Sequence, residues 1–135
     1  MWAVLRGRIM RADVRLLVAD DHPMFRYGLV LSLTQLGFGY VAEAADGQAA
    51  VEACVREAFD VVVLDLKMPR LNGFEAAKAI LQGTSPKARR PKIIMLSTFD
   101  QPAVVAASAS LGVDAFLAVG VLPSLYNKAV GGQYE

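Results

Sequence analysis

Three carboxylates follow two largely apolar stretches of the sequence, and they are the residues whose type and spacing best support chemistry. Asp20 and Asp21 come directly after Val14–Ala19, and Asp65 follows the run Val61–Leu64. Short apolar runs rich in β-branched residues are typical of strands buried on both faces of a parallel sheet. Acids at the carboxyl ends of such strands stand where open α/β sheets place their ligand sites.

Three acids close together would repel one another, so the pKa of at least one would be raised unless a cation joined them. Carboxylate oxygens suit a hard divalent cation, above all Mg²⁺, which takes phosphate oxygens among its other ligands. A phosphoryl group is therefore the expected second ligand. Ser97, after the apolar run 93–96, would donate its hydroxyl to a phosphoryl oxygen. The alternatives are a strand-end cap for Ser97 and a structural turn for Asp20 and Asp21.

Five repeats of a strand followed by a helix supply the framework for these residues. The expected strands cover residues 14–19, 40–44, 61–64, 93–96 and 115–118, and the expected helices begin near Pro23, Gly47, Phe74, Pro102 and Leu122. Such alternation predicts an α/β fold, a doubly wound parallel sheet with helices on both faces. Five strands fit the flavodoxin-like order 2-1-3-4-5, which places the first and third strands side by side. The three acids are then predicted to converge at one end of the sheet.

Local signals mark several helix boundaries. The first helix is predicted from apolar residues at helical spacing, namely Phe25, Leu29, Leu33 and Leu36. Gly37 is expected to end this helix in the left-handed conformation. Asp46 and Gly47 are expected to form a turn, in which Asp46 could also cap the second helix, and Gly112 is expected to end the fourth helix.

Length and composition limit the class of protein. We expect residues 1–12 to form a loose extension and residues 13–135 to form one domain. A net charge of +1 gives no electrostatic basis for direct nucleic-acid binding. No apolar run approaches the roughly 18 residues of a membrane span, so no membrane partner is expected. The single Cys54 fits a reducing cytoplasm and is expected to be a small buried hydrophobe on a helix.

Four motifs, in order and with matching spacing, give the chain a resemblance to a known family. They are D-D-H-P at 20–23, D-L-K-M-P-R-L-N-G at 65–73, S-T at 97–98 and F-L-A at 116–118. Together they resemble the receiver domain of bacterial two-component response regulators, which has a CheY-like fold. The residues after D-D-H-P (Phe25, Arg26, Gly28 and Leu29) resemble the NarL-type subgroup. Such regulators usually carry a DNA-binding domain after the receiver. We expect the 135 residues to hold the receiver alone, with DNA reached only through that other domain.

The resemblance implies that Asp65 is the phosphoacceptor, which takes a phosphoryl group from a sensor histidine kinase or a small phosphodonor as a mixed anhydride. It also implies a Mg²⁺ site. Asp21 would bind the ion directly and Asp20 largely through water, together with Asp65 and the backbone carbonyl of Lys67. Beyond autophosphorylation and autodephosphorylation with Mg²⁺, no enzyme activity is expected.

The same resemblance assigns the residues that respond to phosphorylation, and it also identifies a departure from the family. Ser97 matches the switch hydroxyl and Phe116 the switch aromatic, whereas His22 is given no chemical role. Val119 stands where receivers carry an almost obligatory lysine. Without that cation a phosphorylated acid keeps uncompensated negative charge. We therefore expect metal binding to persist and phosphorylation-driven switching to be impaired.

Several alternatives remain open. Lys67 either bends over the site as a partial substitute for the missing cation or is an exposed loop lysine. The domain is either a phosphoacceptor despite Val119 or a phosphorylation-independent pseudo-receiver that acts as an interaction module. A Mg²⁺-dependent phosphatase using Asp65 is disfavoured, because Lys67 occupies the place of its general acid. Flavin binding is disfavoured because no phosphate-binding loop follows the first strand.

Output is expected through protein–protein contacts. The face formed by the fourth helix, fifth strand and fifth helix, or the first and fifth helices, would support a homodimer. The fifth helix, Leu122 to Val130, is short, which would expose apolar residues such as Leu125.

Overall fold

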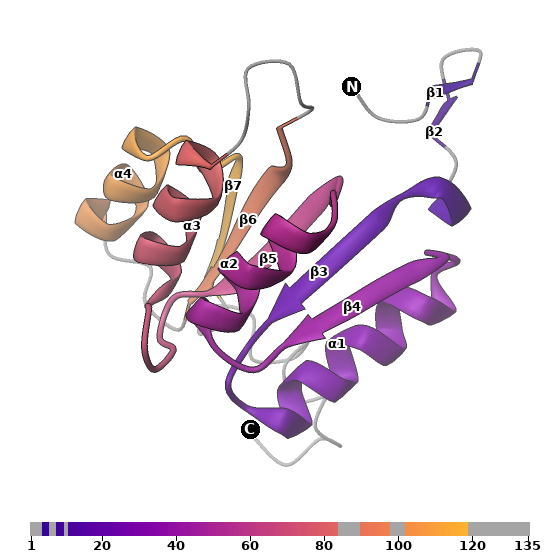
Figure 1. The fold of residues 1–135 in the computed structure, drawn as a ribbon, viewed down its shortest axis with the longest axis horizontal. Helices are drawn as coiled ribbons and strands as arrows, with labels where there is room; N and C mark the ends of the chain where they lie inside the picture. The colour runs from indigo at the N-terminus through magenta and orange to yellow at the C-terminus, as the bar shows by residue number, and fades with distance from the viewer. Residues whose placement is uncertain (1–3, 6–7, 10, 84–89, 98–101, 119–135) are drawn as a thin grey trace.

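The computed structural model describes residues 4–5, 8–9, 11–83, 90–97 and 102–118. One five-stranded parallel sheet lies at its centre (Figure 1). Its strands are β3 (Arg15–Ala19), β4 (Tyr40–Ala44), β5 (Val61–Asp65), β6 (Lys92–Ser97) and β7 (Ala115–Ala118). They are arranged in the order β4-β3-β5-β6-β7, which confirms the predicted 2-1-3-4-5 topology.

Helices cover both faces of the sheet. Helix α1 (Pro23–Gln35) packs on one face, and the opposite face carries α2 (Gly47–Arg56), α3 (Gly73–Gln82) and α4 (Pro102–Ser110) (Figure 1). This division follows from the two-residue period of a strand, which sends alternate side chains to opposite faces. In β5, Val62 and Leu64 belong to the core under α2 and α3, whereas Val61 and Val63 belong to the core under α1.

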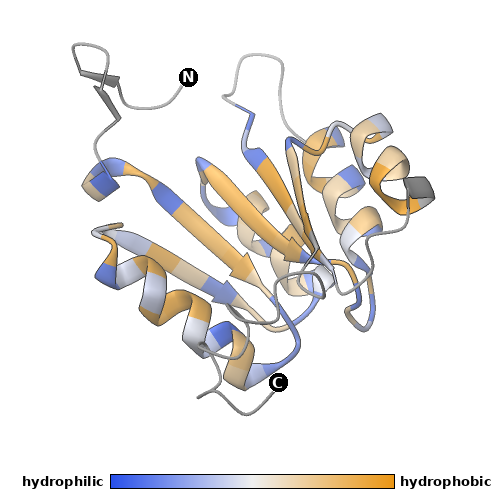
Figure 2. Ribbon diagram, turned by 180° about the vertical axis from the view of Figure 1, so that it is seen from behind, coloured by the Kyte–Doolittle hydropathy of each residue, from blue (hydrophilic) through white to orange (hydrophobic). Residues whose placement is uncertain are grey.

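The central strands are buried because both of their faces are covered. The four residues Val61–Leu64 are each 9% exposed or less, and Figure 2 shows the central strands hydrophobic along most of their length. Full burial of each such side chain contributes roughly 1.5–3 kcal/mol of hydrophobic free energy. Parallel pairing of β3 with β5 sets Ala19 against Leu64. The residues that follow these two strands therefore emerge side by side.

The predicted helix boundaries at Gly37, Asp46 and Gly112 are confirmed. Asp46 accepts a hydrogen bond from the backbone N–H of Ala49 at 2.7 Å. Gly37 and Gly112 have φ angles of 98° and 91°. Leu36 differs from the expectation, because it lies just beyond α1 and is 54% exposed.

Hydrogen bonds at the end of α1 explain this difference. The Phe38 N–H donates to the Leu33 carbonyl and the Gly37 N–H to the Thr34 carbonyl. This Schellman pattern ends the helix one residue before Leu36. Arg11 also donates to the Leu36 carbonyl at 2.6 Å, so a residue from the expected loose extension contacts the end of α1.

The remaining predictions have mixed outcomes. Within residues 1–12, β1 (Val4–Leu5) pairs with β2 (Arg8–Ile9) as an antiparallel ladder. A 3-10 helix over Arg11–Asp13 follows at the boundary with the predicted domain. Cys54 lies on α2 and is partly buried. Burial, with a smaller contribution from Glu57, raises its pKa to about 11.

None of the helices within the described part of the chain is long and apolar enough to cross a membrane. The predicted helix 122–130, with Leu125, lies outside the described residues.

Candidate functional site

The structure brings together the three acids that were predicted to converge. Asp20 and Asp21 follow β3, and Asp65 is the last residue of the neighbouring strand β5. With His22, each offers one ligand atom, and all four atoms lie within 4.8 Å of one another. The convergence follows from the topology, because the carboxyl ends of adjacent parallel strands meet at one edge of the sheet.

Burial makes this cluster electrostatically unfavourable without a cation. Asp20 is only 2% exposed, and burial raises its pKa, although a hydrogen bond from the His22 backbone opposes the shift. Burial is also the largest cause that raises the pKa of Asp65 to about 7, followed by the charges of Asp20 and Asp21. A hydrogen bond from the Lys67 backbone N–H to Asp65 has the opposite effect.

One oxygen of Asp21 shows that the site suits a metal ion. Asp21 Oδ1 is buried and accepts no hydrogen bond within the described part of the chain, although His22 Nδ1 lies 3.2 Å away. A buried carboxylate oxygen that accepts no hydrogen bond is costly. Together with Asp20 and Asp65, it forms the set of hard oxygen donors that Mg²⁺ prefers.

A cavity of about 610 Å³ opens beside Asp21. Its other wall is formed by the segment after β5, through Leu66, Lys67, Met68, Pro69, Asn72 and Phe74. Asn72 and Glu75 form a reciprocal capping box at the start of α3, and the Gly73 N–H donates to the Leu66 carbonyl at 2.7 Å. The two ends of the loop are thereby held, and the cavity leaves open space between this loop and Asp21.

The two predicted switch residues lie on β6, which is next to β5, and on β7, which is next to β6. Ser97 ends β6 and is 2% exposed, one residue beyond Leu96, the register partner of Asp65. Phe116 lies on β7 opposite Met95 and packs against the core. Thr98 and Val119 lie outside the described residues.

Two neighbours of the acids were not assigned a role from the sequence. His22 Nδ1 lies 3.2 Å from an oxygen of both Asp20 and Asp21, and its place directly after two strand-end acids was the available signal. Arg26, on the first turns of α1, donates to the Asp20 carbonyl at 2.6 Å and pairs with Glu43 at 3.0 Å. No residue pattern indicated that contact, because it depends on how α1 packs beside β4.

Comparisons with known proteins agree with this geometry. The family model that describes the response regulator receiver domain matches residues 16–121. NarL of Mycobacterium tuberculosis, described as a probable transcriptional regulatory protein, is 37% identical over 105 residues, which cover 77% of this chain and 47% of NarL. The Escherichia coli response regulator UvrY is 32% identical over 123 residues, which cover 90% of this chain and 55% of UvrY. The chain thus spans about half the length of these relatives.

Solved structures show the same architecture. The receiver domain of the histidine kinase CKI1 from Arabidopsis thaliana, in complex with Mg²⁺ and BeF₃⁻, superimposes with a TM-score of 0.74 at 26% identity. The match covers 90% of this chain and 87% of that one. The chain therefore belongs to the response-regulator receiver domain family of two-component systems and is similar to its NarL-type members.

Proposed function

We propose that Asp65 accepts a phosphoryl group from a sensor histidine kinase and that the domain signals through protein–protein contacts. The observation that carries this proposal is the convergence of Asp20, Asp21 and Asp65 at the edge of the sheet, where one carboxylate oxygen of each lies within 4.8 Å of the other two. An Asp65 oxygen would attack phosphorus while the P–N bond of the donor phosphohistidine breaks and its electron pair leaves with the imidazole. The contribution of the domain is positioning and charge neutralisation.

Receiver domains generally bind Mg²⁺ at an acidic site, and the donor set here fits that ion. Asp21 would hold it directly, Asp20 largely through water, and Asp65 and the Lys67 carbonyl would complete the protein ligands. The bound ion would supply positive charge to the phosphoryl oxygens. The cavity beside Asp21 supports access for the donor group.

In this proposal Ser97 and Phe116 respond to the phosphoryl group, but the response is impaired. Ser97 would donate its hydroxyl to a phosphoryl oxygen. Val119 supplies no cation for the same group, and Lys67, which lines the cavity with Asp21, partly substitutes for it. The named relatives are transcriptional regulators or response regulators, so we further propose that this domain controls a regulator that contacts DNA through a separate domain.

Val119 also favours a second candidate function. A phosphorylation-independent pseudo-receiver would keep the fold and the acids but act only as an interaction module. The two functions differ in whether Asp65 and the metal site bind a phosphoryl-like group.

Beryllium fluoride, a phosphoryl mimic, separates the two candidates. Fluorine NMR of the chain with beryllium fluoride and Mg²⁺ is expected to show a bound signal that requires Mg²⁺ and is lost in Asp65→Asn. A wild-type chain without a bound signal would favour the pseudo-receiver.

A further inference from the structure

The loop between β5 and α3 contains a turn that is uncommon for its residue type. The Leu71 N–H donates to the Pro69 carbonyl at 2.8 Å, and Arg70 between them has a φ of 71°. These are the features of the rarer, strained form of the γ-turn. Arg70 is the only non-glycine residue with a positive φ among those that the structure describes. Such a conformation persists only where surrounding contacts hold it.

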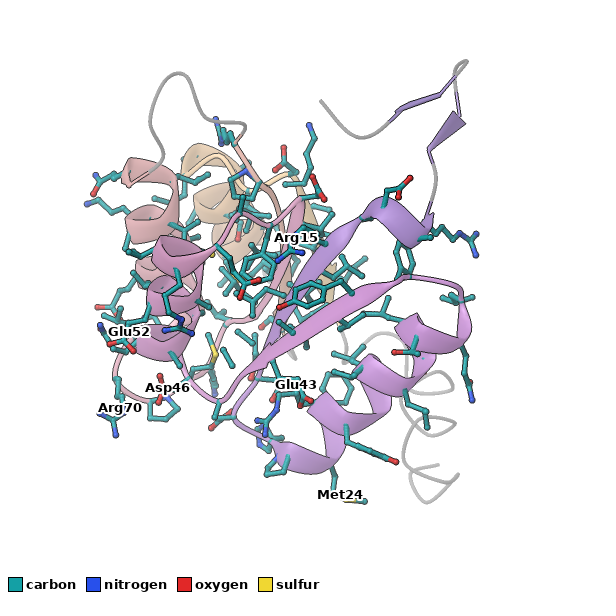
Figure 3. The ribbon with its side chains drawn as sticks, turned by 45° about the vertical axis from the view of Figure 1, so that its right-hand side comes forward. Arg15, Met24, Glu43, Asp46, Glu52 and Arg70 are labelled. Atoms are coloured by element: carbon teal, nitrogen blue, oxygen red, sulfur yellow. The ribbon has the colours of Figure 1, made fainter. Side chains whose placement is uncertain are left out.

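The amino-terminal end of α2 provides one of these contacts. Arg70 Nε lies 3.1 Å from Asp46 Oδ2, and Figure 3 shows the two side chains next to each other at the edge of the molecule. The same Asp46 carboxylate accepts the Ala49 N–H through Oδ1. One side chain therefore caps α2 and binds the loop. The Asp46 side chain is 19% exposed and that of Arg70 is 71% exposed, so solvent weakens the pair without removing it.

Gly47 provides a second contact, between backbones. A Cβ atom on Gly47 would overlap the carbonyl oxygen of Leu71 and approach the Leu71 Cβ to 2.7 Å. The first residue of α2 is thus seated directly against the loop. A glycine is required here by close approach, because any larger residue would push Leu71 away from α2.

We infer that Asp46, Gly47 and Arg70, called here the α2 latch, are positioning residues for the acid cluster. Contacts at Leu66 and Asn72 hold the two ends of the loop, and the latch holds its middle at Arg70 and Leu71. Lys67 lies within this loop, and its N–H binds the Asp65 carboxylate. The inference rests on the proposed function, in which the Lys67 carbonyl is a Mg²⁺ ligand. A loosened latch would therefore weaken Mg²⁺ binding without altering any acid.

The test compares variants that each remove one side-chain charge and preserve the local structure. Asp46→Asn keeps a helix cap, since Asn and Asp cap equally well, and Arg70→Gln keeps a long polar side chain. Lys92→Gln is the matched control, because it removes an exposed cation that lies 4.0 Å from Asp114, away from the cluster. The half-saturating Mg²⁺ concentration is measured directly by calorimetry and also from the rate of phosphorylation by acetyl phosphate, together with the folded fraction by circular dichroism.

Asp46→Asn and Arg70→Gln are each expected to raise the half-saturating Mg²⁺ concentration about two- to threefold, as expected for an exposed ion pair. The maximal rate should stay unchanged, because saturating metal restores the site. The double variant should match either single variant, Arg70→Lys should restore the wild-type value, and Lys92→Gln should have no effect. In about 1 M KCl, where the Debye length is about 3 Å, the difference from wild type should disappear.

Gly47→Ala is expected to raise the half-saturating Mg²⁺ concentration further. If Gly47→Ala fails to fold, Asp46→Asn and Arg70→Gln decide the test. A half-saturating Mg²⁺ concentration equal to that of wild type in both Asp46→Asn and Arg70→Gln would overturn the positioning role of the α2 latch and leave the proposed function intact. A wild-type chain whose phosphorylation does not depend on Mg²⁺ would overturn the proposed function and the latch together.

Discussion

Asp20 and Asp65 present ligand oxygens within 4.8 Å of each other at the carboxyl ends of neighbouring strands. Because Asp20 is almost fully buried, solvent screens their repulsion poorly. The pKa of Asp65 rises to about 7, through burial first and then through Asp20 and Asp21. Near neutral pH the metal-free cluster is therefore partly protonated, and a cation is expected to displace that proton.

Mg²⁺ binding should depend on pH in the range where Asp65 titrates. Binding requires the carboxylate form, so affinity is expected to fall by about tenfold per pH unit below pH 7 and to level off above it. Calorimetry at pH 6 in buffers of different ionisation enthalpy should detect about one released proton per bound ion. Binding at pH 6 without proton release would contradict the raised pKa.

Asp65→Asn should stabilise the metal-free domain above neutral pH. The folded-state pKa of Asp65 lies above the ordinary aspartate value of 3.8, so the folded state binds more protons than the unfolded state between these values. The contribution of Asp65 to the free energy of unfolding is therefore fully present below the lower pKa and is lost as pH rises through about 7. Urea unfolding at pH 8 should show a gain of about 1–3 kcal/mol for the variant, and little gain at pH 4. An equal gain at both pH values would rule out this origin.

Lys67→Ala should lower the phosphorylation yield about two- to fivefold, the effect of losing an exposed cation near the phosphoryl group. The backbone carbonyl remains, so the half-saturating Mg²⁺ concentration should not change. Intact-mass spectrometry after treatment with a phosphodonor measures the yield. Lys78→Ala, on the exposed side of α3, is the control, and an unchanged yield in Lys67→Ala would show that Lys67 is only a loop lysine.

Val119→Lys should strengthen switching. The added cation would pair with the phosphoryl group and couple it to Ser97 and Phe116. NMR resonances of these two residues should shift more on phosphorylation in Val119→Lys than in wild type, and Val119→Met should behave as wild type. Full shifts in the unmodified chain would contradict the expected impairment.

The strands and the convergence of the acids could be predicted because they follow from local pattern and topology. Apolar runs indicated Tyr40–Ala44 and Ala115–Ala118 with the bounds that the structure shows. The Asp46 cap was predictable because a short acid precedes a helical pattern. The capping box of Asn72 and Glu75 is also present in the sequence, three residues apart, directly before the helix predicted to begin near Phe74.

Features that depend on contacts between distant segments could not be predicted. The positive φ of Arg70 occurs at a residue that usually avoids it, and its partner Asp46 is far away in the sequence. The exposure of Leu36 has a local cause instead, because the Schellman hydrogen bonds end α1 at Gln35. His22 has no chemical role that the sequence indicates, and its side chain is largely exposed, yet its Nδ1 lies 3.2 Å from an oxygen of both Asp20 and Asp21.

The most direct test of the account is intact-mass spectrometry after incubation with Mg²⁺ and acetyl phosphate, with Asp65→Asn as the control. The account predicts an adduct of one phosphoryl group that requires Mg²⁺ and is lost in the variant. Failure to form this adduct in a folded wild-type chain that binds Mg²⁺ would contradict the assignment of Asp65 as a phosphoacceptor.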